Sequence, residues 1–142
     1  TPVHAHTALF GVYGLLSLGF TLVIARVLTG ERRWSERPLA FGFWAMNIGL
    51  ALMVLLSLLP IGLAQSWASI EHGLWYARSA EFLQLPALET LRWLRIVGDT
   101  VFLAGVFSFA WFLLGLVTGW SYVREAKPTK DSAEAPVLVG AR

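Results

Sequence analysis

Cysteine is absent from this 142-residue chain, and histidine occurs three times, at His4, His6 and His72. The first absence excludes disulfide frameworks, thiolate zinc sites and cysteine nucleophiles. Charge is also scarce, because Asp, Glu, Lys and Arg make up 14% of the residues, against roughly 25% in average soluble proteins. Hydrophobic residues make up 56%. One domain of this length cannot bury that much apolar surface, which excludes a soluble globule and a disordered chain.

The charge pattern gives no support for a nucleic-acid partner. The formal net charge is only +2, and the basic residues lie in short connectors and do not line one face. The chain begins at Thr1 and has no basic segment before its first apolar run, so we do not expect that run to be a signal peptide. We expect the chain to be a piece of a longer protein.

Long uncharged runs are the main feature that is present. They cover residues 7–25, 38–70 and 100–123. Each reaches or exceeds the roughly 20 residues that a helix needs to cross a bilayer, and only helices and closed barrels satisfy their backbone there. The sequence therefore predicts an all-α membrane protein with three transmembrane helices in a domain over residues 1–123. The expected spans are about 3–28, 38–62 and 88–122, followed by a disordered tail over 124–142.

Turn-forming residues set the expected ends of these helices. Gly30 is a natural stop for the first helix, and Pro38 suits the first turn of the second. The second helix is expected to fade near Pro60–Gly62. The following stretch, QSWASIEHGLWYARSAEFLQLP, carries apolar residues at near-helical spacing and predicts a short helix lying in the membrane interface.

Basic residues predict the orientation. The connector 26–37 contains four arginines, and the segment after the third span contains four further Lys and Arg residues. The remaining three, Arg78, Arg92 and Arg95, lie on the other side of the membrane. The positive-inside rule therefore places the 26–37 loop and the C-terminus in the cytoplasm.

His4 and His6 are the candidate metal ligands. Residues two apart on a helix point about 200° from each other, so these imidazoles cannot hold one ion but can reach two metal centres on opposite sides. Imidazole is a common axial ligand of haem iron. The alternative is a pair of interfacial histidines bonded to water or lipid headgroups, because a bare histidine-x-histidine pair is a weak motif.

Three segments carry a resemblance to a known family: TPVHAHTALFGVYGLLSLG, RPLAFGFWAMNIGLALMVLLSLLP and WASIEHGLWYARSAEF. Together they resemble the C-terminal end of the nitric oxide reductase large subunit, in its quinol-dependent form, within the haem–copper oxidase superfamily. The three spans would then correspond to the last three helices of a twelve-helix core. The resemblance implies a multi-pass protein of the bacterial inner membrane.

The same resemblance implies roles for the two histidines. His4 would bind the high-spin haem b of the dinuclear site, and His6 would be one axial ligand of the low-spin haem b. The non-haem iron ligands and the second low-spin ligand lie on earlier helices of the family, outside this chain. A fragment with this ligand set is expected to be inactive alone. The remaining helices of the parent protein, the lipid bilayer and quinol would be its partners.

Other polar residues have two interpretations each. Arg92 and Arg95 share a helix face and could bind haem propionates, or could extend toward lipid headgroups. Asp99 is four residues from Arg95 and is expected to pair with it. His72 with Glu71 could belong to a proton or quinol path, or could be solvated.

Three other functions remain open at this point. An oxygen-reducing haem–copper oxidase differs in its second metal, whose ligands are absent here. A cytochrome c-dependent reductase differs in its electron donor. A three-helix membrane anchor without haem belongs to another class altogether.

Overall fold

The computed structural model describes residues 2–123, and these residues form an all-α protein as predicted. Three helical stretches are long and apolar enough to span a membrane, at Val3–Thr29, Glu36–His72 and Pro86–Thr118. Within the described part of the chain the only β-type pairing is an isolated bridge between Trp34 and Tyr122. The predicted tail over 124–142 lies outside the described residues.

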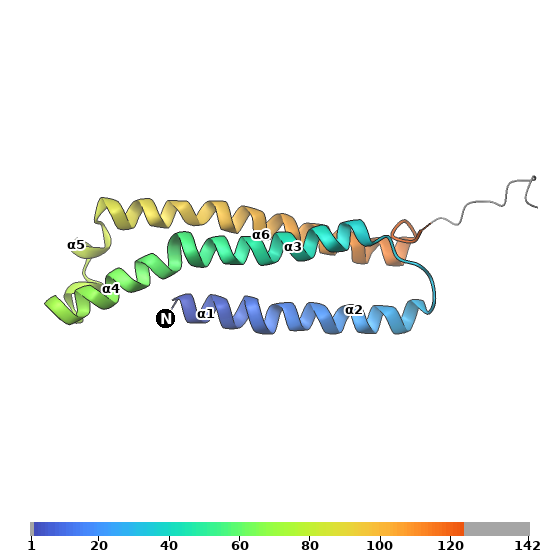
Figure 1. Cartoon of the computed structure of the whole chain (residues 1–142), viewed down its shortest axis with the longest axis horizontal. Helices are drawn as coiled ribbons and strands as arrows, with labels where there is room; N and C mark the ends of the chain where they lie inside the picture. The colour runs from blue at the N-terminus through green and yellow to red at the C-terminus, as the bar shows by residue number, and fades with distance from the viewer. Residues whose placement is uncertain (1, 124–142) are drawn as a thin grey trace, which may run out of the picture.

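The first stretch is one rod made of three consecutive segments (Figure 1). They are α1 (Pro2–His6), the π-helical η1 (Thr7–Gly14) and α2 (Leu15–Thr29). The helix ends where Gly30 adopts a φ of 61° and donates its backbone N–H to the Arg26 carbonyl at 3.1 Å. Positive φ is strained for other residues, so the predicted stop at Gly30 is confirmed.

The second stretch runs ten residues beyond its predicted end at Gly62. It consists of α3 (Glu36–Met53), the π-helical η2 (Val54–Leu58) and α4 (Leu59–His72). A proline inside an α-helix clashes with the carbonyl four residues earlier, which for Pro60 is position 56, inside η2. The wider π-helical turn accommodates the ring, so the helix continues through Pro60 where the sequence predicted an end.

The predicted interfacial helix is also different in the structure. Its first residues form the last two turns of α4, and Gly73, at a φ of 87°, ends that helix. The chain then makes the short 3₁₀ segment η3 (Tyr76–Arg78) and the four-residue α5 (Ala80–Leu83). The Ser79 side chain caps α5 by accepting the Phe82 N–H at 3.2 Å.

The third stretch, α6 (Pro86–Thr118), ends before the predicted boundary near residue 122. Gly119 takes a left-handed conformation and reverses the chain. The returning segment pairs with the connector between α2 and α3: Ser35 N–H donates to the Ser121 carbonyl at 2.7 Å, and Val123 N–H donates to the Arg33 carbonyl at 2.9 Å. The 26–37 loop and the segment after α6 therefore meet at one end of the molecule.

Glycine brings α3 and α6 into direct backbone contact. An ideal Cβ on Gly49 would lie 2.4 Å from the Phe102 backbone nitrogen, and one on Gly98 would lie 2.5 Å from that of Met53. Gly105 faces the Met46 backbone in the same way, at 2.7 Å. Membrane helices with small residues at their contact can approach this closely. Gly98 and Gly105 are spaced i and i+7, which keeps them on one face of α6.

The first rod is packed much less tightly than this pair. No residue of η1 or α2 is buried, whereas Phe112 on α6 is fully buried and Met46 on α3 is 2% exposed. Figure 1 shows α2 running beside α3 and α6 with its outer face uncovered. Such apolar surface suits lipid or further helices, because water is a poor solvent for it.

Candidate functional site

The two histidines of the first helix lie in its first turn and differ in their surroundings. The side chain of His4 is exposed, and that of His6 is half-buried. Both residues lie within the α-helical segment α1, so their side chains diverge by the angle that two helical positions impose. One imidazole faces out of this three-helix unit and the other faces toward α6.

His6 contacts α6 through an arginine and an aromatic pair. Arg95 Nη2 lies 3.2 Å from His6 Nε2. A guanidinium can only donate a hydrogen bond, so Nε2 accepts, and a neutral imidazole with this bond carries its proton on Nδ1. The His6 ring also lies 5.6 Å from that of Phe10, which meets the ring of Phe102 on α6 at 5.6 Å.

Arg95 is held from the other side by Asp99. Its Nε donates to both carboxylate oxygens, at 3.3 Å to Oδ1 and 3.2 Å to Oδ2. The predicted i, i+4 pair is therefore confirmed. About 40% of the Arg95 side chain and 45% of the Asp99 side chain remain exposed. An acid and a base in a membrane helix reduce each other's cost by pairing.

Arg92 has a different partner, although it shares a helix face with Arg95. Its Nη2 donates to the backbone carbonyl of Leu83 at the end of α5, which ties the start of α6 to the preceding turn. Among the four predicted site residues, the structure thus brings His6 and Arg95 together. It does not bring His4 or Arg92 to the same place.

His72 and Glu71 lie at the end of α4 and are both exposed. Their side chains approach to 3.8 Å between Nε2 and Oε2. The His72 ring meets that of Tyr76 edge-on, with centroids 5.0 Å apart.

The donor set of the described residues fits haem better than a mononuclear metal. Within residues 2–123 there is no group of three or more His, Cys, Asp or Glu side chains that could hold a metal ion. Haem iron needs only one or two axial donors from the protein, and imidazole Nε2 is a common one. At His6 the Nε2 lone pair accepts the hydrogen bond from Arg95, so iron bound at Nε2 would have to replace this bond.

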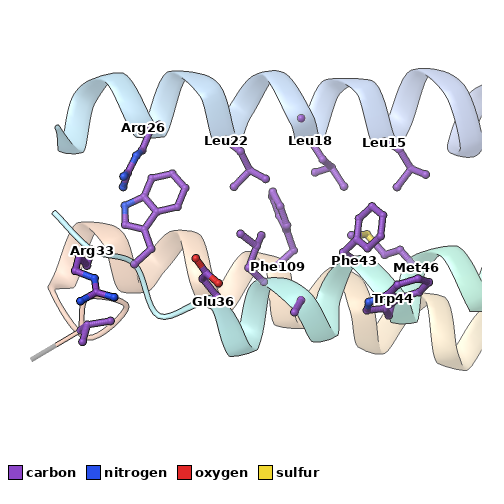
Figure 2. A pocket seen from close by; sticks show the side chains of 15 residues that line it. Leu15, Leu18, Leu22, Arg26, Arg33, Glu36, Phe43, Trp44, Met46 and Phe109 are labelled. Atoms are coloured by element: carbon purple, nitrogen blue, oxygen red, sulfur yellow. The ribbon is translucent and has the colours of Figure 1, made fainter. Parts of the chain in front are cut away.

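A cavity of about 1010 Å³ separates α2 from α3 and α6. Leu15, Leu18 and Leu22 point into it from α2 and face Phe43 and Phe109 across the gap (Figure 2). Its end near the α2–α3 connector carries three charged side chains, those of Arg26, Arg33 and Glu36. No pattern in the sequence predicted this cavity.

Two further contacts were also missed. The pairing of His6 with Arg95 joins positions that are 89 residues apart, and no periodicity within either helix indicates it. The Phe10–Phe102 contact is equally remote in sequence. The scarcity of charge in the sequence was the one available signal. A half-buried arginine such as Arg95, in so apolar a chain, needs polar partners.

Comparison with known proteins finds a matching protein family. The family model described as cytochrome c and quinol oxidase polypeptide I matches residues 1–101. This range includes α1 with His4 and His6, and the first half of α6 with Arg95 and Asp99. No curated protein matches the chain.

Proposed function

The chain belongs to the family of cytochrome c and quinol oxidase polypeptide I, the haem–copper oxidase type of respiratory membrane protein, and we propose that it is part of a quinol-dependent nitric oxide reductase. The complete enzyme would reduce two molecules of nitric oxide, with two electrons and two protons, to nitrous oxide and water. This chain supplies two axial haem ligands and is inactive alone.

The divergent histidine pair carries this proposal. His4 is exposed on the outer side of α1, while His6 is half-buried against α6. A helix with one imidazole on each side suits a position between two haems. In this proposal His4 binds the high-spin haem b and His6 binds the low-spin haem b.

The chain's own residues hold and orient these groups. The haems, when bound, accept and pass on electrons. Iron bound at His6 Nε2 would take the place of the Arg95 guanidinium that donates to this atom. Arg92 and Arg95 supply guanidinium groups for haem propionates, since arginine pairs well with carboxylates. The non-haem iron and the second low-spin ligand belong to residues outside this chain.

The proposed setting is the bacterial inner membrane. Residues 1–123 form the end of the catalytic domain, equivalent to the last three of twelve helices, and the remaining helices of the parent protein cover the first rod. The basic 26–37 loop meets the segment after α6 at one end, and this end is cytoplasmic by the positive-inside rule. Lipid covers the outer apolar faces, and quinol donates the electrons.

A second candidate is an oxygen-reducing haem–copper oxidase. The description of the matching family, cytochrome c and quinol oxidase, favours this reading. The two functions share the histidine pair and differ in the second metal, which is copper in one and iron in the other.

A metal and haem count on the full-length, detergent-purified parent protein tests the proposal. Two b-type haems and one further iron per chain, without copper, are expected for the nitric oxide reductase. Stoichiometric copper would instead establish the oxygen reductase. A parent protein without haem would overturn both and leave a membrane anchor.

A further inference from the structure

We propose that the cavity between α2 and the α3–α6 pair is a binding site for one anionic phospholipid. The lipid phosphate lies at Arg26 and Arg33, and an acyl chain extends from there along Leu22 toward Leu15. This inference goes beyond the proposed function and does not depend on it, because the histidine pair lies in α1, at the opposite end of the first rod (Figure 1).

The walls of the cavity are apolar over the depth of one lipid leaflet. Leu15 and Leu22 point into it from α2 and face Phe43 across the gap (Figure 2). The Phe43 residue is 52% exposed, so this chain leaves that wall uncovered. On α2, Leu15 lies eleven residues before Arg26, which is about 16 Å of helix. One half of a hydrocarbon core of about 30 Å is about 15 Å thick, so the depth of the cavity suits an acyl chain.

The charged end of the cavity lies at the level of a lipid headgroup. The span Val3–Thr29 ends here and the span Glu36–His72 begins here. The charged residues that line this end are Arg26, Arg33 and Glu36, which leave one net positive charge. Within residues 2–123, neither arginine forms a salt bridge. A lipid phosphate is the complementary group, because basic pockets between membrane helices bind anionic headgroups.

The Arg26 guanidinium is held in place at this end by the connector between α2 and α3. Its central carbon lies 5.1 Å from the centroid of the Trp34 ring, and its Nη1 donates to the Arg32 carbonyl at 2.8 Å. Trp34 is itself fixed, because its indole N–H donates to Thr29 Oγ1 at 3.1 Å and its ring meets that of Phe112 edge-on at 5.4 Å. A guanidinium has five N–H donors, so further donors remain for a phosphate. A group that is already ordered loses less entropy on binding.

The experiment is a lipid titration of the full-length parent protein, delipidated in detergent and followed by native mass spectrometry. The probes are phosphatidylglycerol and phosphatidylcholine with the same acyl chains, which differ in net headgroup charge. The wild type should bind one phosphatidylglycerol more tightly than it binds phosphatidylcholine. Arg26→Gln and Arg33→Gln should each weaken phosphatidylglycerol binding about fivefold, because a basic residue at the membrane surface contributes about 1 kcal/mol.

Arg37→Gln is the matched control for the two arginine variants. Arg37 is exposed and belongs to the same end of the molecule, but it does not line the cavity. Its removal should leave the affinity for phosphatidylglycerol close to that of the wild type. Glu36→Gln tests the sign of the charge effect: it removes the carboxylate at the charged end and should tighten phosphatidylglycerol binding.

Gly19→Leu tests whether an acyl chain occupies the cavity. Gly19 lines the cavity, and nothing lies within 4 Å of its ideal Cβ. Leucine is a good helix former, and its side chain would occupy the space of the acyl chain, so phosphatidylglycerol binding should weaken. Thr21→Leu is the control, because Thr21 is exposed on the same helix and does not line the cavity. It should bind phosphatidylglycerol as the wild type does.

Three results would overturn the inference. The first is equal affinity of the wild type for the two lipids, and the second is binding by Arg26→Gln and Arg33→Gln that equals that of Arg37→Gln. The third is equal binding by Gly19→Leu and Thr21→Leu, because the phosphate would then be bound at the surface with no chain in the cavity. If Arg26→Gln fails to fold, as judged by circular dichroism, Arg33→Gln alone decides the charge effect.

Discussion

Gly49 on α3 lies so close to α6 that a Cβ atom on it would sit 2.4 Å from the Phe102 backbone nitrogen. The neighbour here is main chain, which cannot rotate away as a side chain can. Gly49→Ala should therefore push the two helices apart and destabilise the parent protein by roughly 1–3 kcal/mol. Thermal unfolding in detergent, followed by circular dichroism, measures this.

Gly19→Ala is the matched control for that substitution. Gly19 is also within a helix, but nothing lies within 4 Å of its ideal Cβ, and alanine is the better helix former. Its unfolding temperature should be equal to or above that of the wild type. Equal behaviour of the two variants would refute the close α3–α6 contact.

The histidine pair predicts two different spectral losses. His4→Ala in the full-length protein should remove the high-spin haem signal and spare much of the low-spin one, because the two imidazoles diverge on α1. His6→Ala should do the reverse. Optical and electron paramagnetic resonance spectra of the purified variants measure this, and identical spectra would contradict separate centres. His72→Ala should leave both signals in place.

An interhelical hydrogen bond gives a smaller, measurable effect. Ser108 Oγ donates to the Pro38 carbonyl at 2.8 Å and links α6 to the start of α3. Ser108→Ala should cost about 0.5–1.5 kcal/mol in thermal unfolding, the usual range for one hydrogen bond. In Ser17→Ala the lost bond is to the Tyr13 carbonyl of the same helix, so this control should change stability less. A larger loss for Ser17→Ala would contradict this ranking.

The proposed orientation can be measured with paired cysteine substitutions. Glu31→Cys lies in the 26–37 loop and Glu71→Cys near the end of α4, and both side chains are exposed. In intact cells a membrane-impermeant maleimide should label Glu71→Cys, and should label Glu31→Cys only after lysis, each compared with the unsubstituted parent. The opposite pattern would reverse the topology derived from the positive-inside rule.

The sequence predicted the helix starts and the first stop well, because these depend on local chemistry. Gly30 ends the first helix because a positive φ suits glycine. The predicted ends of the second and third helical stretches were wrong, because the residue types near them do not by themselves determine where the helix stops. Pro60 was read as a breaker, but the π-helical turn before it accommodates the ring, and such a turn has no strong residue signature.

In the candidate site, too, contacts within one helix could be predicted from the sequence and contacts between segments could not. The i, i+4 spacing of Arg95 and Asp99 was sufficient to predict their ion pair. The different partners of Arg92 and Arg95 could not be predicted, since the helix face that they share does not show which group approaches it. Leu83 approaches one and His6 the other only after the chain has turned through α5.

The sequence by itself determined that this chain is a three-span membrane protein with a divergent histidine pair. Hydrophobic runs, turn residues and helical angles are properties of neighbouring residues, and these were sufficient. Only the tertiary structure decided that His6 meets Arg95 and that α3 and α6 touch through Gly49 and Gly98. Those contacts join distant segments, and they form because two helices must find a complementary surface, which no local pattern encodes.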